Sequence, residues 1–164
     1  MSTNPAAKPI LSLESFFEQV QAGDPVGAAY RLEQSAGRDA PGQLFYEAGA
    51  LALDRRDELG DDALRFARIA FEEAVDRDPD LGEAHHDLAT AMREFGMADD
   101  AILHYRRALK LLPQDPDTLI GLGAALCDAG KLKEAIKMLK HATTEHPDNG
   151  LAYANTAACT KKNS

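Results

Sequence analysis

Apolar and small residues recur at steps of three and four along residues 82–149, with polar residues between them. Such spacing is the period of an α-helix that buries one stripe. Gly96 and Gly130 interrupt the stripe, where a helix has to end and the chain has to turn. The pattern therefore predicts two helical hairpins. Their stripes consist of His85, Leu88, Ala89, Met92, Ala101, Tyr105 and Ala108 in the first, and Leu119, Leu122, Gly123, Leu126, Ala135, Leu139 and Ala142 in the second.

The hairpin is a repeated unit. Pro79, Pro113 and Pro147 lie 34 residues apart, and Gly96 and Gly130 keep the same interval. A fixed interval of this size indicates that one structural unit has been copied and stacked. Proline closes each copy because it cannot continue a helix interior but is well placed beside a helix start. We therefore predict that each copy contains a helix, a tight turn and a second, antiparallel helix.

The copies resemble the tetratricopeptide repeat (TPR), a helix–turn–helix unit of 34 residues. Leu122, Gly123 and Leu126 match the family's pattern in the first helix, and Ala101 with Tyr105 matches it in the second. Alanines at the facing positions let two helix backbones approach closely. The resemblance implies an all-α fold, a right-handed α-solenoid of stacked antiparallel helix hairpins with a C-terminal capping helix.

The resemblance extends more weakly towards both ends of the chain, and it divides the chain into segments of one domain. We expect a disordered tail at 1–10, a degenerate N-terminal helical hairpin at 11–41, a TPR-like repeat with a six-residue insertion at 42–81, full repeats at 82–115 and 116–149, and a capping helix at 150–164.

The insertion falls between the two helices of the repeat at 42–81. Ala48 and Ala67 are 19 residues apart, whereas the equivalent Leu88 and Ala101 are 13 apart. Six residues are close to two helical turns. We expect each helix to gain about one turn, with Gly60 in the connecting turn and an aspartate as the cap of the second helix.

Composition agrees with a helical protein and narrows its partners. Hydrophobic residues make up 45% of the chain and are largely alanine and leucine, without tryptophan, which favours helices over sheets. The net charge of −9 makes the chain acidic and argues against nucleic-acid binding, which needs a basic face. No apolar stretch is long enough to span a membrane. The two cysteines make no disulfide framework, so we expect a cytoplasmic protein. From the charge and the lack of a spanning segment we expect no nucleic-acid and no membrane partner.

Catalytic and metal-binding motifs are not found in the sequence. The five histidines form no HExxH or His-x3-His pairing. Asp76, Asp78 and Asp80 have the spacing of a calcium loop, but Leu81 stands where that loop needs glycine. The sequence contains no GxSxG motif and no glycine-rich phosphate loop. We therefore expect neither an enzyme nor a bound metal or cofactor.

The resemblance instead implies that the protein binds another protein in a concave groove lined by the first helix of each repeat. An apolar row on an exposed concave face usually marks an interaction surface. The positions that the resemblance assigns to this groove are Tyr46, Ala50, Leu53, Glu83, His86, Thr90, Arg93, Asp117, Ile120, Ala124, Cys127 and Leu151.

These positions exclude one mode of binding known in the family. One TPR subclass grips the C-terminal carboxylates of heat-shock chaperones with lysine, asparagine and arginine on the groove helices. Here Glu83, Asp117, Ile120 and Ala124 cannot form such a cationic clamp, and Arg93 is the one basic residue of the set. A groove of mixed apolar and polar character is better suited to an extended or helical peptide held by apolar anchors.

Two functional interpretations remain open, and both make the partner a protein. The first is a peptide-binding scaffold or adaptor in a larger assembly. The second is a small all-TPR chaperone that escorts a secreted or unfolded client. A third and weaker alternative is homo-oligomerisation through the C-terminal helix.

Overall fold

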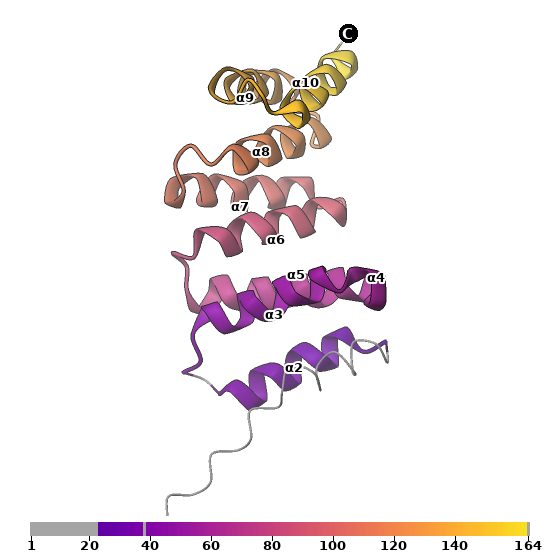
Figure 1. Ribbon diagram of the computed structural model, residues 1–164, viewed down its shortest axis with the longest axis vertical. Helices are drawn as coiled ribbons and strands as arrows, with labels where there is room; N and C mark the ends of the chain where they lie inside the picture. Colours follow the sequence, from indigo (N-terminus) through magenta and orange to yellow (C-terminus); the bar gives the residue numbers. More distant parts are fainter. Residues whose placement is uncertain (1–22, 38, 164) are drawn as a thin grey trace, which may run out of the picture. The chain divides into compact units, whose positions relative to one another are not determined.

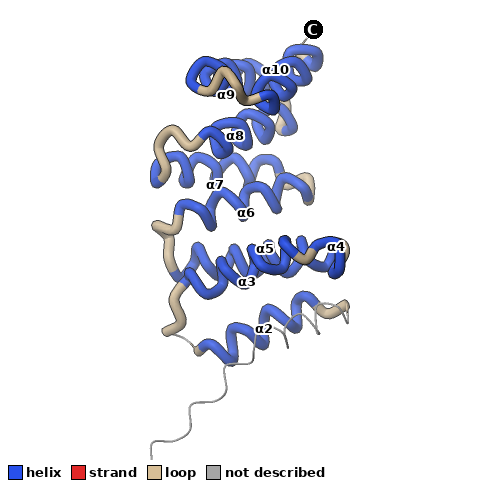
Figure 2. Tube along the Cα trace, in the orientation of Figure 1, coloured by secondary structure: helices blue, strands red, loops and turns tan. Residues whose placement is uncertain are grey.

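The computed structural model describes residues 23–37 and 39–163, and every regular element within these ranges is an α-helix (Figures 1 and 2). The predicted tail at 1–10 and the first helix of the predicted N-terminal hairpin lie outside the described residues. The chain divides into two compact units, the first ending at Asp78 and the second beginning at Pro79.

The first unit is built on an antiparallel pair of helices, α3 (Gly42–Asp54) and α5 (Asp61–Arg77), with α2 (Pro25–Ala36) packed against α5. Arg77 joins the parts of this unit. Its guanidinium donates hydrogen bonds to the carbonyl oxygens of Gly37 and Ala40, each at 3.1 Å, and lies 4.4 Å from the centre of the Phe45 ring. One side chain therefore holds the α2–α3 connection and α3 onto the end of α5.

The six-residue insertion differs in part from its prediction. The helix α5 has 17 residues, against 14 in the equivalent α7 and α9, so the second helix gains about one turn as expected. The first helix does not lengthen, because α3 ends at Asp54 and a separate turn, α4 (Arg56–Leu59), follows. Leu59 explains the break, since it is buried where α4 packs on α5.

The start of α5 also differs from its prediction. Gly60 lies in the connecting turn with φ +63°, a backbone conformation that favours glycine. The N-cap position is Gly60 itself, with no side-chain cap, so the expected aspartate cap is wrong. Asp61 and Asp62 occupy the first turn of α5 instead, where a carboxylate interacts favourably with the helix dipole.

The second unit contains two hairpins and a further helix. The pairs are α6 (Gly82–Glu94) with α7 (Ala98–Leu111) and α8 (Pro116–Asp128) with α9 (Leu132–Glu145), while α10 (Gly150–Lys162) packs on α9 and α8 (Figure 1). Gly96 and Gly130 form the turns, with φ +77° and +74°, as predicted. Nine of the 13 residues of α8 are buried, so this helix is the centre of the unit.

Small residues allow the paired helices to approach closely. A Cβ atom added to Gly123 on α8 would lie 2.5 Å from a methyl carbon of Leu139 on α9. Gly49 occupies the equivalent position on α3, where an added Cβ atom would lie 2.6 Å from the Phe71 ring on α5. Contacts this short are not tolerated between carbon atoms, so the side chain opposite would have to move.

We predict that Gly123→Val destabilises the second unit, because its branched side chain would push α8 away from Leu139. The expected loss in the free energy of unfolding is about 2 kcal/mol, measured by urea unfolding with circular dichroism. Gly150→Ala is the matched control, since no atom lies within 4 Å of a Cβ atom there. A loss as small as that of the control would show that α8 and α9 are not in close contact at Gly123.

Candidate functional site

The predicted binding residues of α6 share one side of that helix. Glu83, His86, Thr90 and Arg93 follow one another at steps of three, four and three, which places them on a single face. Glu83 is exposed, and the other three are half-buried. Asp117, in the first turn of α8, is also exposed. We call these five residues the α6–α8 face.

The remaining predicted residues of α8 are not accessible. Ile120 is 2% exposed and lies in an apolar cluster with Leu119, Ala142 and Ala152, the last of which belongs to α10. Ala124 and Cys127 are each 8% exposed. A partner can reach Ile120 only if α10 leaves its place, because Ala152 of α10 packs in the same cluster. Leu151 of α10, in contrast, is 59% exposed.

Three predicted binding residues belong to the first unit and form a separate set. Tyr46, Ala50 and Leu53 lie on α3 and are half-buried. The ring centre of Tyr46 lies 5.8 Å from that of Phe71 on α5, so the tyrosine contributes to packing within the hairpin. Its substitution would therefore change the stability of the first unit as well as its surface.

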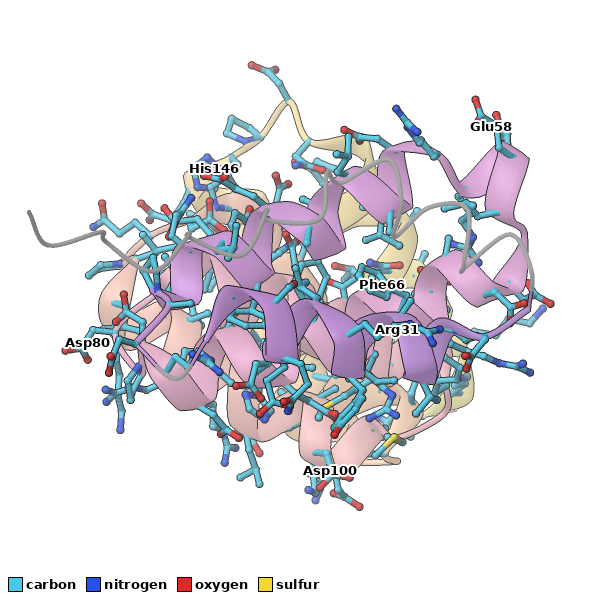
Figure 3. The ribbon with its side chains drawn as sticks, turned by 90° about the horizontal axis from the view of Figure 1, so that it is seen from below. Arg31, Glu58, Phe66, Asp80, Asp100 and His146 are labelled. Carbon is cyan, nitrogen blue, oxygen red and sulfur yellow. The ribbon has the colours of Figure 1, made fainter. Side chains whose placement is uncertain are left out.

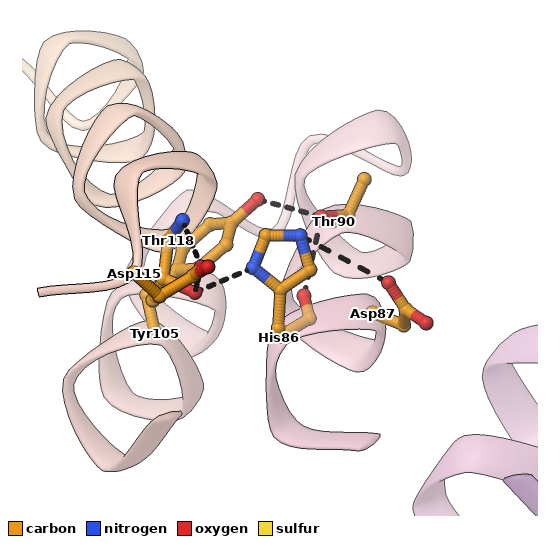
Figure 4. A network of polar contacts seen from close by, with 6 residues as sticks. All are labelled: His86, Asp87, Thr90, Tyr105, Asp115 and Thr118. Carbon is orange, nitrogen blue, oxygen red and sulfur yellow. Dashed lines mark hydrogen bonds and ion pairs between the residues drawn. The ribbon is translucent and has the colours of Figure 1, made fainter. Parts of the chain in front are cut away.

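A chain of hydrogen bonds connects α6 to the start of α8 (Figure 4). The Thr118 hydroxyl donates to a carboxylate oxygen of Asp115 at 2.5 Å, so it has to accept from Nδ1–H of His86 at 2.7 Å. Asp115 also caps α8 by accepting from the backbone N–H of Thr118 at 2.8 Å. These contacts fix the imidazole of His86 relative to both helices.

Two further contacts hold Thr90 and Arg93 in place. The hydroxyl groups of Thr90 and Tyr105 lie 2.8 Å apart, and burial raises the pKa of the Tyr105 phenol above its ordinary value, which keeps it neutral. Arg93 contacts Asp128 of α8 at 3.3 Å. Asp128 in turn lies 3.7 Å from the ammonium group of Lys162 on α10. Polar contacts therefore run from α6 through α8 to α10.

Several members of this network were not identified from the sequence. Thr118, Asp128 and Lys162 carry no motif, and their roles depend on which helices meet. Asp115 did have a signal, because an aspartate directly before proline is a common start of a helix. That signal predicts the cap but gives no indication of the link to His86.

A second pair of polar side chains lies on the inner side of α6. His85 is 7% exposed, as its inward position predicted, and its Nδ1 lies 3.0 Å from Nδ1 of His104 on α7. Its Nε2 lies 3.1 Å from the carbonyl oxygen of Pro79, which can only accept, so this nitrogen carries a proton. Burial lowers the pKa of His85, and the positive charge of Arg107 lowers it further.

Metal binding has no basis in the described ranges, which contain no group of three or more histidine, cysteine, aspartate or glutamate side chains placed to hold an ion. The same residues include no helix that is long and apolar enough to cross a bilayer. Cys127 and Cys159 are both buried, free thiols. Burial, and then the neighbouring Cys127 thiol, raises the pKa of Cys159 to about 11.

Comparison with known proteins finds a family match over part of the chain. A family profile described as tetratricopeptide repeat matches residues 92–159, from the end of α6 into α10. The TPR domain of OM64 from Arabidopsis covers 77% of this chain and 99% of its own, with a TM-score of 0.65 and 18% identity. Over residues 92–159 the chain is similar to tetratricopeptide repeat proteins. The predicted fold class is therefore confirmed, with two stacked hairpins and a capping helix in the second unit.

Two other structures with a similar fold are described together with peptides. The first TPR domain of Spaghetti (RPAP3), bound to the HSP90 peptide SRMEEVD, covers 74% of this chain and 91% of its own, with a TM-score of 0.65 and 18% identity. YrrB, described as a TPR protein with an unusual peptide-binding site, covers 96% of this chain and 85% of its own, with a TM-score of 0.67 and 18% identity. At these identities the likeness concerns the fold alone. No curated protein matches the chain in sequence.

We predict that acid destabilises the second unit through His85. Because its pKa in the folded protein is below the ordinary 6.5, the unfolded chain binds more protons as pH falls. The free energy of unfolding should therefore decrease from about pH 6.5 downwards until the folded pKa is reached. His85→Leu, which copies Leu119 of the next repeat, should reduce this decrease in urea unfolding at pH 7.5 and 5.5. His141→Gln, at an exposed position of α9, is the control. Equal pH dependence in all three proteins would contradict the assignment.

We also predict that Cys159 reacts slowly with alkylating reagents. A rise of its pKa from 9.0 to about 11 lowers the thiolate fraction at pH 8 by about 100-fold, and burial restricts access further. Iodoacetamide labelling followed by peptide mass spectrometry measures the rate at Cys159 itself, with Cys127 left in place. The control is the same chain in 6 M urea. Similar rates in the folded and unfolded chains would refute the prediction.

Proposed function

We propose that this protein is an interaction module that holds a peptide or helical segment of a partner protein on the α6–α8 face, in a scaffold or adaptor role. The match of residues 92–159 to the tetratricopeptide repeat family and the peptides named for structures of similar fold support this role. The observation that carries the proposal is the network that fixes His86, Thr90 and Arg93 on one side of α6 while each remains half-buried.

The network favours binding because it reduces the entropy that a partner has to overcome. A side chain that is already held in one rotamer loses little freedom when a ligand contacts it, whereas a free side chain loses about 0.5–1.5 kcal/mol. His86 is held by Thr118, and Arg93 is held by Asp128. The α6–α8 face therefore presents donors and acceptors at set positions.

Charge indicates which peptides this face does not suit. Glu83, Asp87 and Asp117 supply negative charge, and the positive charge of Arg93 is offset by Asp128 at 3.3 Å. A peptide that ends in several carboxylates would be repelled here. We therefore infer that the partner segment is neutral or basic, in contrast to the SRMEEVD peptide bound by Spaghetti.

The buried residues of α8 change the place of the apolar contacts. Ile120, Ala124 and Cys127 cannot anchor a peptide while α10 covers α8. Leu151, at the start of α10, is the exposed apolar residue among the predicted binding residues of this unit. We infer that polar contacts with α6 determine the register of the partner, with an apolar contact at Leu151.

The proposal predicts that reversing charge on the α6–α8 face abolishes peptide binding. Twelve-residue peptides would be selected by phage display on the intact protein, and their affinities would be measured by fluorescence anisotropy. We expect the double variant Glu83→Lys with Asp117→Lys to bind the selected peptides with at least tenfold lower affinity. Both side chains are exposed, so their loss leaves the core intact.

The control for this experiment carries the same change in charge on the second helices of the hairpins. Asp100 on α7 and Glu145 on α9 are exposed, and the side chain of Asp100 points away from the ribbon (Figure 3). Asp100→Lys with Glu145→Lys should leave the affinities within twofold. If selection yields no peptide, or if both double variants bind equally well, the proposed binding face is wrong.

A further inference from the structure

The first unit contains an apolar pocket that the proposed function does not use. It has a volume of about 170 Å³ and lies among α2, α3 and α5. Its floor consists of Leu32, Phe45 and Ala70, each at most 2% exposed, and Val26 and Tyr30 of α2 stand at its rim. This pocket is formed within one unit, on residues separate from the α6–α8 face.

The size of the pocket limits what can enter. Sites for cofactors and other small molecules usually measure about 300–1,000 Å³, well above this volume. A cavity of about 150 Å³ lined by leucine, isoleucine and phenylalanine is known to take up benzene, which has the size of a phenylalanine ring. The pocket is therefore suited to one large apolar side chain.

The rim extends the apolar surface beyond the pocket itself. Val26 is 64% exposed and Tyr30 is 61% exposed, and both lie on the same side of α2 because they are four residues apart. Two large apolar side chains exposed together beside an apolar pocket form a continuous surface, which in soluble proteins marks a binding site. A partner with two apolar residues one turn apart would cover it.

Charge at the rim indicates the chemistry of the partner. Glu33 and Glu73 line the pocket together with its apolar residues. Glu73 is paired with Arg77, whereas the described residues offer Glu33 no such partner. Residues 23–78 contain 13 aspartates and glutamates against seven arginines and no lysine. The surroundings of the pocket therefore attract a positively charged segment.

We propose that this pocket is a second interaction site, which takes one large apolar side chain from a partner segment that carries lysine or arginine one helical turn from that anchor. The apolar side chain enters between Phe45 and Ala70, and the basic residue lies against Glu33. A second apolar residue of the segment packs on Val26 and Tyr30. The site requires no change in the helices of the first unit.

The test uses three helical peptides of equal length on an alanine and glutamine background. The first carries phenylalanine and leucine four residues apart, with lysines one turn away on both sides. The second has glutamates in place of the lysines, and the third has serines in place of the two apolar residues. NMR titration of the full chain measures the affinities. We expect the first peptide to bind at least tenfold more tightly than either of the others.

Matched variants locate the binding. Val26→Ser with Tyr30→Ser should weaken the first peptide at least tenfold, whereas Leu103→Ser, at a position that is also 64% exposed, should have no effect. Glu33→Lys should weaken it at least threefold, and Glu58→Lys, on α4 and pointing into solvent (Figure 3), less than twofold. Unchanged circular dichroism spectra would show that these surface changes leave the fold intact.

Four outcomes would overturn the proposal. The first is equal binding of the three peptides, and the second is full affinity in the Val26 and Tyr30 variant. The third is binding that starts only after residues 1–22 are deleted, since the chain's own N-terminal segment would then occupy the pocket. The fourth is self-association of the chain that these rim variants abolish, without peptide binding, since a second copy would then be the occupant. None of these outcomes would bear on the proposal that the α6–α8 face binds a peptide.

Discussion

The close approach of the two helices within each hairpin is the constraint on which the rest of the structure depends. Gly123 faces Leu139, and Gly49 faces Phe71, at distances that leave no room for another carbon atom. Alanines such as Ala101 and Ala135 are fully buried. Because these residues are small, the large side chains opposite them fill the space between the helices, and each first helix is held in a fixed rotation.

That rotation determines which side chains of α6 remain at the surface. His85 turns inward to meet His104, whereas the adjacent His86 turns towards Thr118 and stays half-buried. The same rotation in α8 would expose Ile120, but α10 packs over it and buries it. The accessible surface of the second unit is therefore polar on α6, and the apolar residues of α8 belong to the core.

The two surfaces that we propose for binding are of different kinds. On the α6–α8 face, hydrogen bonds between helices hold polar groups in position, which favours specificity. In the first unit, a pocket among α2, α3 and α5 offers an apolar cavity beside carboxylates. Neither surface resembles the cationic clamp of chaperone-binding TPR domains, because the exposed charge at both is largely negative.

Periodicity along the chain was sufficient to predict the helices from α6 to α9, the turns at Gly96 and Gly130, and the opposite orientations of His85 and His86. These features depend on neighbours three or four residues away, which a linear pattern records. The separate turn α4, the burial of Ile120 under α10 and the network from Asp115 to His86 were decided by tertiary structure. Each depends on contacts between different helices, and the alternation of polar and apolar residues contains no information on which helices meet.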